Sequence, residues 1–110
     1  MTDTPTRRQK IEKMLLDEPK DLFLRYALAI EMAKEGEIEP AVTKLAELQH
    51  GTPPYIPAFF KAGQILADAD EIARSRAVLR AGVEEARVQG DHHAAGEMSE
   101  LLADLGSRGD

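Results

Sequence analysis

Apolar residues along the chain recur at intervals of three and four, which is the spacing that one face of an α-helix requires. Between residues 26 and 48 the sequence reads "YALAIEMAKEGEIEPAVTKLAEL", in which two runs of helix-forming residues are separated at Gly36. Signals for strands, such as sustained alternation or an Asn-Gly hairpin, are almost missing. The pattern therefore predicts an all-α protein.

Prolines, glycines and capping residues divide this pattern into segments of similar size. Pro19 cannot continue the first helix, Asp21 is a candidate N-cap for the second, and Gly36 suits its left-handed C-terminal residue. Gly90 and Asp91 form another stop and start near the C-terminus. Because the connections are short, neighbouring helices are expected to pack antiparallel. The predicted helices span residues 6–17, 21–34, 38–50, 55–68, 71–89 and 91–105.

A comparison of the chain with itself shows a period of 34 residues. Small residues meet small ones and large apolar residues mostly meet large apolar ones. The matching pairs are Leu22 and Ile56, Ala29 and Gly63, Met32 and Leu66, Gly36 and Asp70, Ala41 and Ser75, and Leu45 and Leu79. A period of 34 with a helix–turn–helix in each unit resembles the tetratricopeptide repeat.

The family's pattern, W-x2-L-G-x2-Y followed by A-x3-F and then P, can be placed on both units in register. In the first unit its positions hold Leu28, Ala29, Met32, Ala41, Leu45 and Pro53, and in the second Phe59, Ala62, Gly63, Leu66, Ser75 and Leu79. Two positions depart from it: Arg25 stands at the first Trp and Arg87 at the second closing Pro. The fifth helix is therefore expected to continue past the usual boundary.

The resemblance implies antiparallel helical hairpins stacked as a short right-handed α-solenoid of about six helices. A single domain, 1–110, would then comprise a half-repeat helix at 6–17, repeats at 22–55 and 56–89, and a capping helix at 91–105. Small residues are expected where the helices of a hairpin turn or pass close together. These repeat-packing positions are Ala29, Gly36, Ala41, Gly63 and Ser75.

In this family the first helix of each unit lines a concave groove that binds extended peptides or helices. The resemblance therefore implies a protein-interaction module or scaffold. By the repeat register, the groove residues are Phe23, Tyr26, Ile30, Ala33, Lys34, Pro57, Phe60, Gln64, Ala67 and Asp68. We expect that hairpin packing does not require the aromatic residues on this face, and an exposed apolar-aromatic surface is typical of a contact site.

Some members of the family hold a C-terminal carboxylate with Lys, Asn and Arg from the groove. The corresponding positions here hold Tyr26, Ile30 and Lys61, so this clamp is not expected.

Three alternatives concern the surface that is used. In one, the first and sixth helices cover the groove residues and bury them as core. In another, the groove binds a second copy of the chain, because two full units are fewer than a stable solenoid usually needs; a homodimer is the most specific expectation. In the third, an accessory or assembly domain uses Arg74, Arg76 and Arg80 to contact protein or phosphate, although Arg80 is also spaced to pair with Glu84.

Composition narrows the class of protein further. The chain has no cysteine, which excludes disulfides and thiolate metal sites, and its net charge of −6 argues against nucleic-acid binding. No apolar stretch is long enough for a signal peptide or a membrane span. We therefore expect a cytoplasmic protein without nucleic-acid or membrane partners.

Candidate chemistry is sparse. His93, Glu97 and Glu100 have a spacing that could bind zinc, but a hydrated helical turn capped by Asp91 explains them equally simply. There is no justified Ser/His/Asp arrangement and no glycine-rich phosphate loop after a strand. We expect no enzyme activity, no metal and no cofactor.

Overall fold

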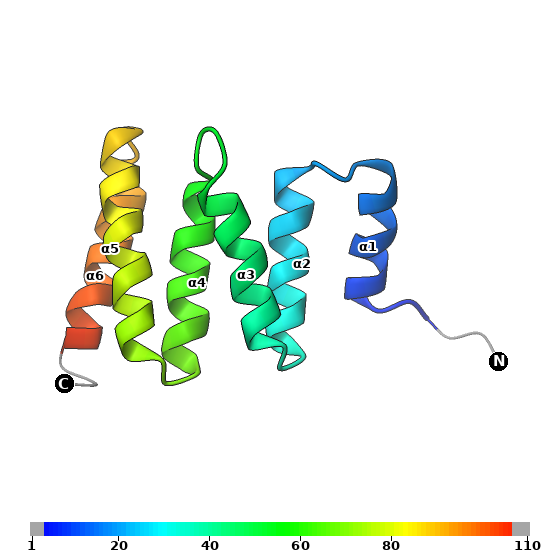
Figure 1. Ribbon diagram of the computed structural model, residues 1–110, viewed down its shortest axis with the longest axis horizontal. Coiled ribbons are helices and arrows are strands. Elements are labelled where there is room, and N and C mark those ends of the chain that lie inside the picture. The colour runs from blue at the N-terminus through cyan, green and yellow to red at the C-terminus, as the bar shows by residue number, and fades with distance from the viewer. Residues whose placement is uncertain (1–3, 107–110) are drawn as a thin grey trace.

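The computed structural model describes residues 4–106, which form six α-helices and no strand (Figure 1). The helices are α1 (Arg7–Asp17), α2 (Leu22–Lys34), α3 (Ile38–Gln49), α4 (Ile56–Asp68), α5 (Ile72–Val88) and α6 (His92–Gly106). Every predicted helix is present, and each end lies within one residue of its predicted position. The all-α prediction is confirmed.

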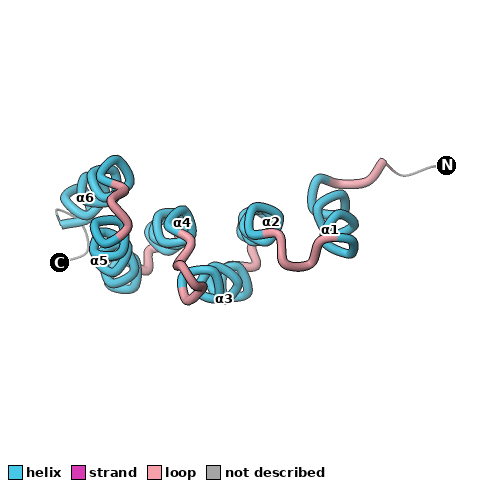
Figure 2. The backbone as a smooth tube through the Cα atoms, turned by 90° about the horizontal axis from the view of Figure 1, so that it is seen from above, coloured by secondary structure: helices cyan, strands magenta, loops and turns pink. Residues whose placement is uncertain are grey.

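The helices pack in sequence order, and each one runs antiparallel to the next (Figure 1). Seen from above, α2, α4 and α6 lie on one side of the molecule, and α3 and α5 lie on the other (Figure 2). Further contacts join α2 to α4 and α4 to α6, whereas α1 packs against α2 alone among the helices. The resulting array measures 50 × 29 × 19 Å.

Side-chain caps begin two of the helices where the sequence predicted them. One carboxylate oxygen of Asp21 accepts the backbone N–H of Leu24 at 2.8 Å, and one of Asp91 accepts that of Ala94 at 3.1 Å. Each cap satisfies a backbone donor that has no partner inside the first turn of the helix.

The corners of the two central hairpins have the same backbone geometry. Gly36 has a φ of 87°, and Asp70, 34 residues later, has a φ of 61°. The following amide N–H then donates to the carbonyl five residues back, from Glu37 to Met32 at 2.9 Å and from Glu71 to Leu66 at 2.8 Å. This arrangement satisfies the last carbonyls of α2 and α4, as in the usual left-handed helix ending.

The helices of these hairpins also follow the 34-residue period. Both α2 and α4 have 13 residues, and their ends are offset by 34 positions. The starts of α3 and α5 have the same offset, but α5 has 17 residues and α3 has 12. The extension of α5 agrees with the prediction made from Arg87.

The small residues of the repeat lie at close helix contacts. Ala29, Ala41 and Ser75 are fully buried, and the Ser75 hydroxyl donates to the Gly63 carbonyl at 2.6 Å. A Cβ atom added to Gly63 would lie 2.5 Å from a side-chain carbon of Leu79. The absence of a side chain at Gly63 therefore lets α4 and α5 pack at this distance.

A second glycine with the same role was not identified from the sequence. A Cβ atom added to Gly82 would lie 2.5 Å from the sulfur of Met98 and 2.6 Å from the Cβ of Phe59. Gly82 thus permits α5 to pack closely against both α4 and α6. The repeat comparison matched Gly82 with a leucine, so its packing role depends on α6.

Charged contacts join α1 to the first hairpin. Arg8 pairs with Glu37 and, at 3.2 Å, with Glu35, both at the corner between α2 and α3. Arg7 lies 3.3 Å from Glu31 of α2. These pairs reinforce the apolar contact around Ile11, the one fully described residue of α1 that is buried.

Candidate functional site

Two adjoining pockets lie on the side of the molecule formed by α2, α4 and α6, and we call them together the groove. The larger, the aliphatic pocket, has a volume of about 690 Å³ and is lined by Ile30, Ala33, Lys34, Ile38, Lys61, Gln64, Ile65, Ala67, Asp68, Ala69 and Leu101. The smaller, the aromatic pocket, has about 250 Å³ and is lined by Tyr26, Ile56, Pro57, Phe60, Lys61, Gln64, Asp91, Ala94 and Glu97. Lys61 and Gln64 line both.

Nine of the ten groove residues derived from the repeat register line one of these pockets. The exception is Phe23, which lies in the first turn of α2 with 61% of its surface exposed. The structure thus brings the predicted side chains of α2 and α4 to one continuous surface. Their role in binding remains a prediction.

The aromatic pocket is held by ring packing. The rings of Tyr26 and Tyr55 meet edge to face, with centroids 5.7 Å apart and planes inclined at 66°. Burial raises the pKa of the Tyr26 hydroxyl above its ordinary value, and neighbouring Tyr55 adds to the rise. Phe60 is half-buried against the core shared by α4, α5 and α6. The expectation that packing does not require these aromatic residues is therefore wrong for Tyr26 and Phe60.

The terminal helices do not bury the groove. α1 packs against α2 alone among the helices, and no residue of α1 lines either pocket. α6 forms a wall, contributing Leu101 to the aliphatic pocket and Ala94 and Glu97 to the aromatic pocket. The alternative in which both terminal helices cover these residues is therefore wrong, because α1 and α6 dock at the edges of the array.

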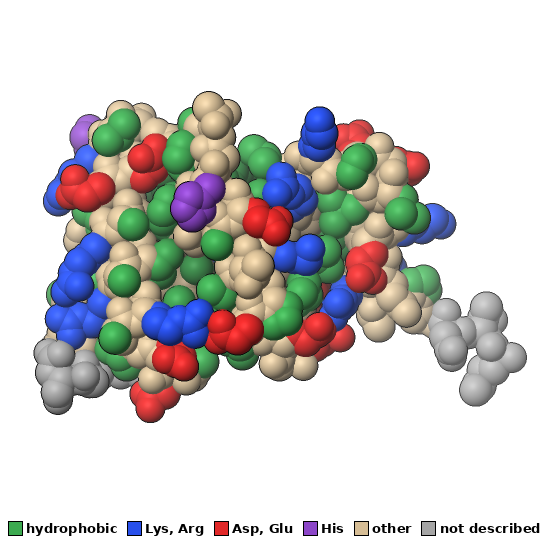
Figure 3. Space-filling view, in the orientation of Figure 1, with side chains coloured by type: hydrophobic (Ala, Val, Ile, Leu, Met, Phe, Trp, Pro, Cys, Tyr) green, Lys and Arg blue, Asp and Glu red, His purple; other side chains and the backbone are tan. Residues whose placement is uncertain are grey.

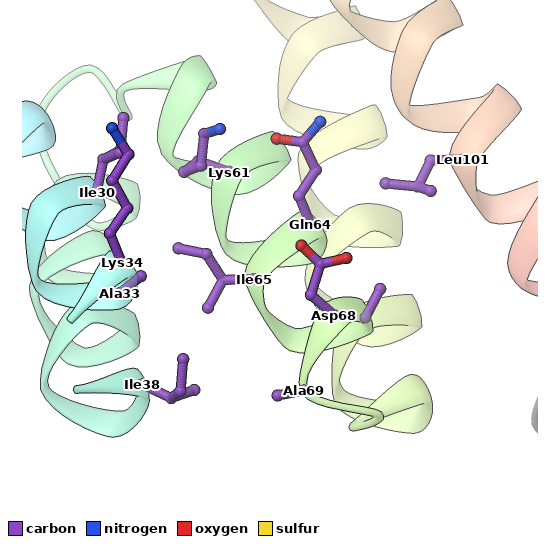
Figure 4. Close-up of a pocket in the computed structure, with 11 residues that line it drawn as sticks. Ile30, Ala33, Lys34, Ile38, Lys61, Gln64, Ile65, Asp68, Ala69 and Leu101 are labelled. Atoms are coloured by element: carbon purple, nitrogen blue, oxygen red, sulfur yellow. The ribbon is translucent and has the colours of Figure 1, made fainter. Parts of the chain in front are cut away.

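Charged side chains stand on both helices around the aliphatic pocket (Figure 4). Lys34 of α2 and Lys61 of α4 stand on its two sides, and Asp68 lies beside Gln64 toward α6. The ammonium group of Lys34 is 3.2 Å from Glu31. Within residues 4–106, Lys61 forms no ion pair or hydrogen bond.

Some residues of the pocket were not assigned to it from the sequence. Lys61, Ile65 and Asp68 follow a helical spacing of four and three on α4, so the first two could have been found by extending the predicted face. Leu101 could not, because α6 lies outside the two repeat units and its docking angle depends on tertiary packing.

The arginines of α5 are engaged on the opposite side of the molecule. Two guanidinium nitrogens of Arg74 contact the two carboxylate oxygens of Glu39 at 2.7 and 3.0 Å, and the contact lowers the pKa of Glu39. Glu84, which its spacing paired with Arg80, lies instead 3.0 Å from Arg87. Figure 3 shows basic and acidic side chains beside one another over α3 and α5. This mixture does not form a basic surface suited to phosphate.

The histidines near the C-terminus form an exposed pair rather than a cluster. His93 lies 3.0 Å from Glu97, and both side chains are largely exposed. Across residues 4–106 no group of three or more His, Cys, Asp or Glu residues is placed to hold a metal ion. In the same range, no helix has the length and apolar character needed to cross a membrane.

Comparisons with known proteins provide the fold but no family. No family model matches the chain, and no curated protein matches its sequence. Among solved structures it is similar to protein BPP2914 from Bordetella parapertussis, with a TM-score of 0.79 and 22% sequence identity. The match covers 94% of this chain and 90% of that one. At this identity the likeness shows a shared fold alone.

Proposed function

We propose that this chain is a protein-interaction module, built as a short tetratricopeptide-like solenoid, that holds a segment of another protein or of its own copy in the groove. The observation that carries the proposal is the coincidence of two independent results. The repeat register selects ten residues from sequence alone, and nine of them line two adjoining pockets. An apolar pocket with a few polar side chains is the usual form of a binding site.

The internal geometry supports the solenoid. α2 and α4 are equal in length and offset by 34 residues, and their C-terminal corners have matching positive φ angles. In a solenoid each unit contacts its neighbours in sequence, as these helices do. The classification remains our proposal, and it supplies the expectation that the groove is the binding surface.

The proposal is tested by photocrosslinking from inside the groove. Gln64 lines both pockets, and Thr43 on α3 is exposed and lines neither, so it provides a matched control position. Each is replaced in turn by a photoreactive p-benzoylphenylalanine in the cells that produce the protein. We expect a defined adduct from position 64 that is absent from position 43, with mass spectrometry identifying the crosslinked segment.

The identity of the adduct separates the two forms of the proposal. An adduct to a second copy, together with a dimeric mass by light scattering across a concentration series, supports self-association. An adduct to another protein, with a monomeric mass, supports a free groove. Equal crosslinking from both positions contradicts the groove as the interaction surface.

A further inference from the structure

We propose that the aliphatic pocket binds an amphipathic segment in which aliphatic side chains enter the pocket and a neighbouring aspartate or glutamate side chain contacts Lys61 and Lys34. The inference rests on the function proposed above and specifies the chemistry of the ligand. A partner protein carrying such a segment is the occupant to which we commit.

The interior of the pocket is suited to aliphatic side chains. Seven of its eleven lining residues are apolar, and none of the eleven is aromatic. The apolar ones are Ile30, Ala33, Ile38, Ile65, Ala67, Ala69 and Leu101. Its volume of about 690 Å³ lies within the range of pockets that enclose a ligand, roughly 300–1,000 Å³. Branched aliphatic side chains can therefore lose water there without leaving polar groups unpaired.

The charge of the pocket is opposite to that of the chain as a whole. Lys34, Lys61 and Asp68 give its lining a formal charge of 2 − 1 = +1, whereas the whole chain carries −6. The one carboxylate beside Lys34 is Glu31, which is shared with Arg7 at 3.3 Å and so does not neutralise both cations. Asp68 lies on the side toward α6 (Figure 4). The opening between α2 and α4 is therefore positive.

Lys61 is the residue through which an acidic group gains most. Its side chain is half-buried, lines both pockets, and forms no ion pair or hydrogen bond within the described residues. A carboxylate placed against it replaces lost hydration by a charged contact, while a cationic group there is repelled by both lysines. Such like-charge repulsion is a common source of selectivity between partners.

The test uses two synthetic peptides of about 15 residues, a length at which an isolated helix is marginal. Both are acetylated and amidated and carry leucine and alanine at helical spacing. The remaining positions are glutamate in one and lysine in the other, so every carboxylate belongs to a side chain. Fluorescence anisotropy measures their affinity for the full chain, for Lys61→Glu, and for Lys13→Glu on the exposed face of α1, which carries the same net charge.

We expect the glutamate peptide to bind the unaltered protein about tenfold more tightly than the lysine peptide. Lys61→Glu should remove or reverse this preference, and Lys13→Glu should leave it unchanged. Lys61→Gln, which keeps the length of the side chain without its charge, should give an intermediate preference. Circular dichroism melting of each variant checks that the fold is retained.

Three results would overturn the inference. They are tighter binding of the lysine peptide, equal loss from Lys61→Glu and Lys13→Glu, and no binding of either peptide up to about 1 mM. A gain confined to a glutamate peptide with a free C-terminus would assign the contact to a terminal carboxylate and also overturn it. In each case a specific adduct from position 64 would leave the proposed protein-binding function standing, so the two failures are distinguishable.

Discussion

The two central hairpins, α2–α3 and α4–α5, share one backbone frame but differ in how deeply they are buried. Four residues of α2 and three of α3 are buried, against eight of α4 and six of α5. The second hairpin is packed between the first hairpin and α6, whereas the first has α1 on its outer side. Equal local geometry therefore coexists with unequal packing, which depends on the neighbours of each hairpin.

The difference is clearest at the small residues. The first hairpin has Ala29 and Ala41 where the second has Gly63 and Ser75, and all four are buried. In the second hairpin the approach to Leu79 leaves no room for a methyl group, and a serine hydroxyl binds the glycine carbonyl. A sequence repeat thus specifies that a position is small, and packing determines how small.

Gly63→Leu is the change with the largest expected effect on this comparison. Its Cβ would already lie within 2.5 Å of the fully buried Leu79, so the added side chain has to displace the core of the second hairpin. We expect the free energy of unfolding to fall by about 3 kcal/mol or more, as for severe overpacking. Urea unfolding measures the loss.

Gly96→Leu is the matched control for that change, because a Cβ atom at Gly96 of α6 has no neighbour within 4 Å. Leucine has the higher helix propensity, so this variant should be unchanged or slightly more stable. Similar losses at both glycines would contradict the close-packing explanation.

Exchanges at the two corners should act in opposite directions. Gly36→Ala forces a side chain into a φ of 87°, with an expected loss of about 1 kcal/mol. Asp70→Gly relieves a non-glycine residue at a φ of 61°, with an expected gain of about 0.5 kcal/mol. Thermal melting of both variants is the measurement, and changes of the same sign would show that the corners are not equivalent.

The pair between Arg74 and Glu39 joins the two hairpins and gives the smallest effect, since both side chains are largely exposed. Arg74 lowers the pKa of Glu39 in the folded protein, so the contribution is present above the unfolded pKa of the carboxyl group. It is lost as the pH falls through the lowered pKa. The stability difference between the unaltered protein and Arg74→Gln should therefore be largest near neutral pH and vanish in acid.

That dependence is measured by urea unfolding over a pH series. Arg80→Gln, an exposed arginine on the same helix, provides the control. A difference for Arg74→Gln that persists in acid would mean that packing of the arginine stem, rather than its charge, stabilises the contact.

The sequence by itself determined the six helices, their ends, the corners at Gly36 and Asp70, and most side chains of the groove. These features depend on interactions within a few residues: capping, backbone hydrogen bonds, helical spacing and a repeated pattern. The tertiary structure alone decided how α6 docks, and with it the place of Leu101 in the aliphatic pocket and the close contact at Gly82. It also decided that Arg74 meets Glu39, 35 residues away. Such contacts join segments that are distant in the chain, and their geometry follows from the packing of whole helices.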